Sequence, residues 1–73
     1  MSKLPVISGK EVIKALVKLG YYVRDRESSH IHLRHSSGQP LTIPDHKEVA
    51  RGTLRAIIRA AGLTVEEFSR LLK

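Results

Sequence analysis

The hydrophobic residues of this chain change their spacing twice, and that change constrains the fold more than any other feature of the sequence. Between residues 8 and 20 they recur every three or four positions, as in a helix with one buried face. Between residues 21 and 44 they alternate with polar residues, as in strands of a sheet covered on one side. From residue 53 onward the helical spacing returns. The pattern predicts one helix, three strands and two helices, in that order.

The first helix has a clear start and a clear end. Ser8 and Glu11 have the spacing of a capping box, in which each side chain accepts a hydrogen bond from the other residue's amide. Gly20 is suited to the left-handed conformation that ends a helix. The predicted buried stripe consists of Val12, Ile13, Leu16, Val17 and Leu19.

The alternating region predicts three strands in meander order, forming an antiparallel sheet. Ser28 and Ser29 make the first turn, and two prolines limit the third strand to a short edge strand. The residues predicted to face the core are Tyr21, Val23, Ile31, Leu33, Leu41 and Ile43. The residues predicted on the opposite face are Tyr22, Arg24, Arg26, His30, His32 and Arg34. With helices on one face only, this α+β arrangement resembles the double-stranded RNA-binding domain.

The last third of the chain predicts two helices joined by a tight turn at Gly62. Thr53 is expected to cap the first of them, and Thr64 with Glu67 forms a second capping box. The predicted buried residues are Leu54, Ile57, Ile58, Ala61, Val65, Phe68, Leu71 and Leu72.

The same two helices also have the outline of a helix-turn-helix, which offers a second functional interpretation. In that case Arg55, Arg59 or Arg70 would contact phosphates, and the protein would bind DNA without cutting it. Because the second helix begins with Glu66 and Glu67, where a DNA reader presents neutral or basic groups, a purely structural helix pair is favoured.

Net charge is the most informative bulk property. The 73 residues carry 13 Lys and Arg against 7 Asp and Glu, a net charge of +6, which indicates a polyanionic partner. Nucleic acid is the first choice and an acidic protein the second; a basic surface that serves only solubility is the alternative. The chain has no cysteine, and no stretch resembles a secretory signal or a membrane span. We expect a single domain, residues 1–73, in the cytoplasm, with no membrane association.

The predicted outer face of the sheet suits phosphates and bases, and its histidines suit proton transfer. An imidazole can accept or donate a proton near neutral pH. RNA carries its own nucleophile, the 2′-hydroxyl, so a proton-transfer group with nearby cations can cleave it without metal. We therefore consider His30 a catalytic candidate. A second group must supply a proton to the departing oxygen, and His32, His46 or a lysine are the candidates that the sequence leaves open.

Two other uses of these residues are weaker. His30 and His32 share a face and could ligate zinc with His46 or Asp45, although the neighbouring arginines repel a cation. A nucleophilic serine at position 28 or 29 lacks an assured orienting carboxylate, and both serines are typical turn residues. We expect no metal and no small-molecule cofactor.

The chain resembles the HicA toxins of HicA–HicB toxin–antitoxin systems. The resemblance is carried by "LPVISGKEVIKALVKLGY", "SSHIHLRH" and "LTIPDHKEVARGTLRAIIRAAGLTVEEF", which together cover nearly the whole chain. It implies a ribosome-independent endoribonuclease that cleaves mRNA and is inhibited by a HicB-type antitoxin bound over its active surface. The family's catalytic histidine, in a glycine-serine-histidine motif, corresponds to His30.

Ser28 and His46 are two further positions within these motifs. Ser28 replaces the motif's glycine, where a turn with positive φ or a close approach to RNA is expected. His46 matches the family's P-x-H pattern, for which we favour a structural role in the turn over proton transfer. The complete set of predicted RNA-binding residues is Arg24, Arg26, Ser29, His32, Arg34 and Lys47.

Overall fold

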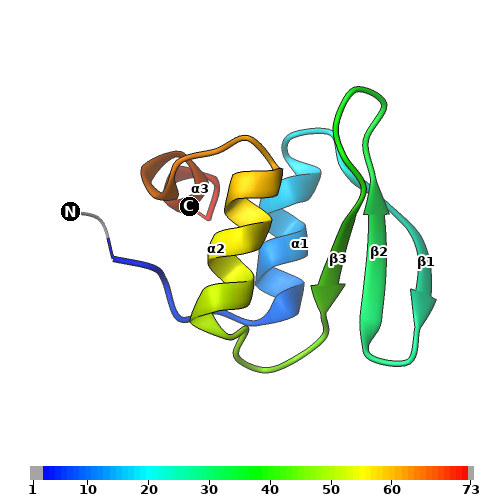
Figure 1. Ribbon diagram of the computed structural model, residues 1–73, viewed down its shortest axis with the longest axis horizontal. Helices are drawn as coiled ribbons and strands as arrows, with labels where there is room; N and C mark the ends of the chain where they lie inside the picture. The colour runs from blue at the N-terminus through cyan, green and yellow to red at the C-terminus, as the bar shows by residue number, and fades with distance from the viewer. Residues whose placement is uncertain (1–2, 73) are drawn as a thin grey trace.

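The computed structural model describes residues 3–72 and has the predicted order of elements. The elements are α1 (Gly9–Val17), β1 (Tyr22–Glu27), β2 (His30–Arg34), β3 (Leu41–Pro44), α2 (Arg51–Ala60) and α3 (Val65–Leu71). The strands form one antiparallel sheet in the order β1-β2-β3, with the three helices gathered on one side of it (Figure 1). This confirms the α+β class, while the likeness to the double-stranded RNA-binding domain stays a prediction. None of the helices within residues 3–72 has the length and apolar character needed to cross a membrane.

The capping box of α1 forms as predicted. The Ser8 hydroxyl accepts from the Glu11 amide at 3.2 Å, and the Glu11 carboxylate accepts from the Ser8 amide at 3.0 Å. After the helix, Gly20 has a φ of 100°, in the region that favours glycine. The prediction that Val17 widens the buried stripe is wrong, because this residue is half exposed. It follows Leu16 by about 100° around the helix, which turns it away from the core.

The core lies between β2, β3 and the helices. Ile31 pairs with Ile43 and Leu33 with Leu41, so four of the predicted inward residues meet as two cross-strand pairs. All four are buried, and the inward set of β2 and β3 is confirmed.

β1 lies at the edge of the sheet farthest from the helices, and all six of its residues are exposed (Figure 1). Val23 pairs with buried Leu33, yet it is 50% exposed. The prediction that Val23 belongs to the core is therefore wrong, because the helices pack over β3 and leave β1 beyond the covered part of the sheet.

A shift of register in β1 changes which arginines share a face. Val23 pairs with Leu33 and Asp25 with the next residue, His32, so Arg24 is an extra residue in a bulge. Beyond the bulge the alternation is reversed relative to the prediction.

The reversal moves Arg26 to the face that carries the helices. Arg26 pairs with Ile31, whose side chain is buried beneath the helices. Asp25 and Glu27 instead pair with His32 and His30 on the outer face. The prediction that Arg26 projects from the outer face is wrong, and two acidic residues share that face with the histidines.

The two C-terminal helices differ in how they begin. At α3, the Thr64 hydroxyl accepts from the Glu67 amide at 3.1 Å and the Glu67 carboxylate accepts from the Thr64 amide at 2.8 Å. At α2 the N-cap is Ala50, without a side-chain hydrogen bond, and Thr53 lies inside the first turn. The predicted Thr53 cap is therefore wrong, because the helix begins ahead of the apolar residues that mark its buried stripe.

The apolar faces of these helices close the core. The buried side chains on α2 and α3 are Leu54, Ile57, Ile58 and Phe68, as predicted. The other predicted members of the stripe, Ala61, Val65, Leu71 and Leu72, are half-buried against that core. Gly62 has a φ of 78° and makes the turn between the helices.

Candidate active site

Two of the four histidines, His30 and His46, line the same hollow. His30 is the first residue of β2, and His46 follows β3 in the connection to α2. Both residues are exposed, and neither imidazole forms a hydrogen bond with any residue in the described range 3–72. The hollow measures about 320 Å³, within the range of ligand sites in proteins. Its lining consists of His30, Thr42, Pro44, His46, Ala50 and Thr53.

Three elements meet at this hollow, which explains how residues distant in sequence come together. His30 pairs with Pro44, so the start of β2 lies beside the end of β3. Ala50 and Thr53 come from the beginning of α2. Because the N-terminus of a helix carries partial positive charge, and no side chain caps this one, the local field favours an anion.

His32 is held in the outer face of the sheet by two polar neighbours. One ring nitrogen, Nδ1, lies 3.1 Å from the Thr42 hydroxyl, and Nε2 lies 3.3 Å from the Glu27 carboxylate. Both ring nitrogens are therefore occupied within the protein.

His35 is a structural histidine. Its Nδ1 accepts from the Ser37 amide at 3.0 Å, and its Nε2 lies 2.8 Å from the Leu19 carbonyl oxygen. Since an amide can only donate, Nδ1 has the lone pair and Nε2 carries the proton. The ring packs against Tyr21 with centroids 4.8 Å apart. These contacts with Leu19 and Tyr21 place the ring on the side of the sheet that carries the helices.

A second hollow, of about 390 Å³, lies on the outer face beside the first. It brings together three of the predicted RNA-binding residues: Arg24, His32 and Arg34. Asp25 and Glu27 also line it, so its charge is mixed. Thr42 lines both hollows, which makes them neighbours. Thr42 was not among the site residues predicted from the sequence. The alternation of polar and apolar residues in the third strand could have placed it on the outer face, where it pairs with His32.

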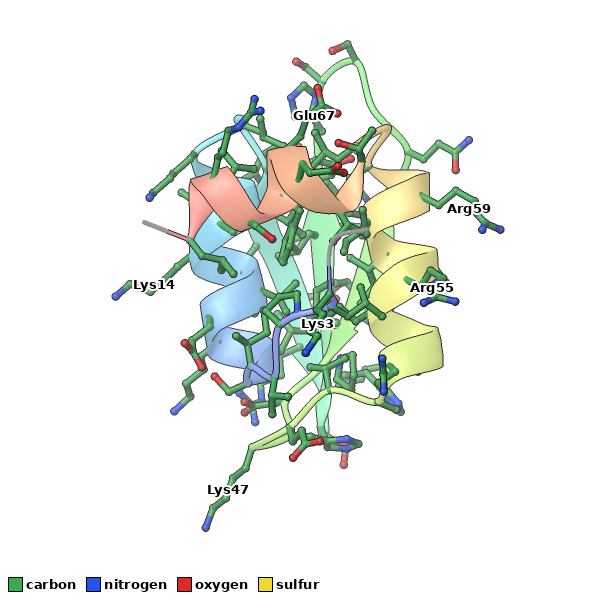
Figure 2. All side chains as sticks on the ribbon, turned by 90° about the vertical axis from the view of Figure 1, so that its left-hand side faces the viewer. Lys3, Lys14, Lys47, Arg55, Arg59 and Glu67 are labelled. Atoms are coloured by element: carbon green, nitrogen blue, oxygen red, sulfur yellow. The ribbon has the colours of Figure 1, made fainter. Side chains whose placement is uncertain are left out.

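The other predicted RNA-binding residues lie apart from this hollow. The Arg26 guanidinium binds the Asp45 carboxylate at 2.6 Å. Ser29 is half-buried, and its carbonyl oxygen accepts from the Asp45 amide at 2.7 Å. Lys47 is exposed and projects away from the body of the protein (Figure 2).

The zinc site considered above does not form. No three His, Cys, Asp or Glu side chains within residues 3–72 are grouped closely enough to hold a metal ion. His32 points to the second hollow while His30 and His46 line the first, which separates the proposed ligands.

The C-terminal helices α2 and α3 both contribute side chains to the core. Phe68 of α3 is fully buried. Arg55 and Arg59 of α2 are exposed and form no ion pair with any residue in the range 3–72 (Figure 2). The acidic start of α3, at Glu66 and Glu67, is exposed as well. Core packing alone accounts for this helix pair. DNA binding by the pair stays a prediction.

Fold and site together define a small basic α+β protein with two unbonded imidazoles in one surface hollow. The family model described as the HicA toxin of bacterial toxin–antitoxin systems matches residues 9–63, and the chain belongs to this family. Membership confirms the resemblance and implies an antitoxin as a partner. A comparison with curated proteins found no significant match.

Proposed function

We propose that this HicA toxin is a metal-independent endoribonuclease that cleaves mRNA, with His30 taking part in proton transfer at the scissile phosphate. The observation that carries the proposal is the state of the His30 imidazole, which is exposed, unbonded within the described chain, and placed in a hollow large enough for a ligand. Membership of a toxin family supports the same assignment.

The proposed reaction uses the ribose as its nucleophile. The 2′-hydroxyl loses its proton to an imidazole while its oxygen bonds to phosphorus, and the bond from phosphorus to the 5′-oxygen breaks. The departing oxygen takes up a proton. The products are a 2′,3′-cyclic phosphate and a 5′-hydroxyl, and no other reactant is consumed. The positive end of α2 favours the negative charge that develops on the phosphorus oxygens.

The neighbouring hollow supplies the phosphate contacts in this proposal. Arg24 and Arg34 offer guanidinium groups to the RNA backbone, and exposed Tyr22, paired with Arg34, offers a ring on which a base can stack. His32 is held between Glu27 and Thr42, so its role is to shape the surface or contact a base rather than to transfer protons.

Cleavage assays in the presence of a chelator test this function. The purified protein should cut mRNA in excess EDTA and leave cyclic phosphate and 5′-hydroxyl ends. An oligonucleotide with a single 2′-deoxy substitution at the cleavage position should remain intact there. If the RNA is retarded on a gel but never cut, the protein is a non-catalytic nucleic-acid-binding module and the enzyme proposal fails.

We propose further that the antitoxin is of the HicB type and covers the hollow that holds His30. The net charge of +6 supports an acidic partner surface, because complementary charge accelerates and orients association. Mixing the protein with a HicB-type antitoxin should abolish cleavage and protect the amides of β2 from hydrogen exchange. Inhibition with protection confined to α3 would contradict this position.

A further inference from the structure

We infer that His46 is the second proton-transfer group and acts together with His30 across the shared hollow. This inference rests on the proposed function and adds a catalytic residue to it. It also revises the structural role in the turn that the sequence favoured for His46.

The surroundings of the His46 side chain do not fit a structural role. Its imidazole is exposed and forms no hydrogen bond with residues 3–72, so no polar contact of the ring holds the turn. His35 shows what a structural histidine looks like in this protein, because both of its ring nitrogens and one ring face are occupied. The His46 imidazole instead resembles that of His30, which is also exposed and without a hydrogen bond in the described range.

The backbone around His46 is nevertheless firmly held. The His46 carbonyl oxygen accepts from the Gly9 amide at 2.9 Å, and the Val49 amide donates to the Ile7 carbonyl oxygen at 2.9 Å. Gly9 packs so closely that a Cβ atom there would collide with the Pro44 carbonyl oxygen. The backbone therefore holds His46 beside the hollow, while its exposed imidazole leaves both ring nitrogens available to a substrate.

A direct link also fixes the two histidines relative to each other. Ser29 precedes His30 and Asp45 precedes His46, and the Asp45 amide donates to the Ser29 carbonyl oxygen at 2.7 Å. The two residues therefore enter the hollow from adjacent, hydrogen-bonded backbone positions.

Two imidazoles meet the full proton requirement of the proposed reaction. One, neutral, takes the proton of the 2′-hydroxyl as the oxygen–phosphorus bond forms. The other, protonated, gives its proton to the 5′-oxygen as that bond to phosphorus breaks. His32 is less suited to this part because its ring nitrogens contact Thr42 and Glu27.

Single-turnover cleavage by His46→Ala, in chelator and over a range of pH, tests the inference. We expect a loss of about 10²-fold or more, the usual contribution of general acid–base catalysis. The rate of the wild type should depend on two groups, giving a rise and a fall with pH, and His46→Ala should lose one of these two limbs. Glu48→Gln, an exposed change in the same segment, is the matched control and should cleave at the wild-type rate.

A substrate with sulfur in place of the bridging 5′-oxygen separates catalysis from positioning. Sulfur leaves without a proton, so this substrate should restore the variant that lacks the acid, either His46→Ala or His30→Ala, and not the other. Restoration of neither variant, or wild-type cleavage of ordinary RNA by His46→Ala, would overturn the role of His46. A wild-type protein that cuts no RNA would instead overturn the proposed function itself.

Discussion

The Arg26 guanidinium lies 2.6 Å from the Asp45 carboxylate and ties the β1–β2 turn to the segment that carries His46. Its Nε also donates to the Ser28 carbonyl oxygen at 3.0 Å. Together with the hydrogen bond from the Asp45 amide to Ser29, these contacts join the residues that precede both histidines of the hollow. We interpret Arg26 as a positioning residue and not as the phosphate contact that the sequence indicated.

A double-mutant cycle on Arg26 and Asp45 tests this interpretation. Arg26→Ala and Asp45→Ala should each lower the free energy of unfolding in urea by about 1 kcal/mol, since the pair is partly exposed. The double variant should lose little more than either single variant, because both changes remove the same interaction. Both single variants should also lower kcat without changing the affinity for RNA.

A change in RNA affinity would instead identify Arg26 as a phosphate contact. If Asp45→Ala tightened RNA binding while Arg26→Ala weakened it, the arginine would serve RNA and the positioning role would be wrong. Arg24→Ala is a suitable comparison for the stability measurement, because its nearest carboxylate, on Asp25, is 4.0 Å away and both side chains are more than half exposed.

Ser28→Gly is expected to stabilise the protein. Ser28 has a φ of 55°, as anticipated for the position where the family motif has glycine. Relief of the left-handed conformation outweighs the extra freedom of glycine in the unfolded chain, for a net gain of about 0.5 kcal/mol. Thermal melts should show a higher Tm for Ser28→Gly and a lower one for Ser29→Gly, whose φ is not positive. A lower Tm for both variants would contradict the strain at position 28.

Gly9→Ala is expected to destabilise the protein and impair cleavage together. The new methyl group would collide with the Pro44 carbonyl oxygen, forcing α1 away from the segment that leads to His46. Such overpacking costs about 1–3 kcal/mol. Gly52→Ala is the control in urea denaturation, because nothing lies within 4 Å of its added atom and alanine favours the helix. Equal stability of Gly9→Ala and the wild type would contradict the close approach.

Replacing Arg24 and Arg34 by Gln should weaken RNA binding in a salt-dependent way. Each phosphate neutralised on single-stranded RNA adds about 0.7 to the slope of log affinity against log salt, so the slope should fall by that amount for each arginine replaced. Filter binding with a catalytically inactive background gives the slope directly. Replacing Arg55 and Arg59 on α2 should leave it unchanged; a reduced slope there would favour nucleic-acid binding by the helix pair.

The sequence predicted the elements well because their signals are local. Ser8 with Glu11 and Thr64 with Glu67 mark two helix starts within four residues, and alternation alone turns His30 and His32 outward. The bulge at Arg24 has no comparable signal, so the face of Arg26 was predicted wrongly. The position of the hollow depends on long-range contacts such as Gly9 with His46, which no local pattern records.

Cleavage of RNA by His30→Ala is the most direct test of the central claim, that an unengaged imidazole in the hollow performs proton transfer. The variant should bind RNA with unchanged affinity, melt at the wild-type temperature because the side chain is exposed, and show no cleavage in chelator. Cleavage by His30→Ala at the wild-type rate, with the same product ends, would contradict the account.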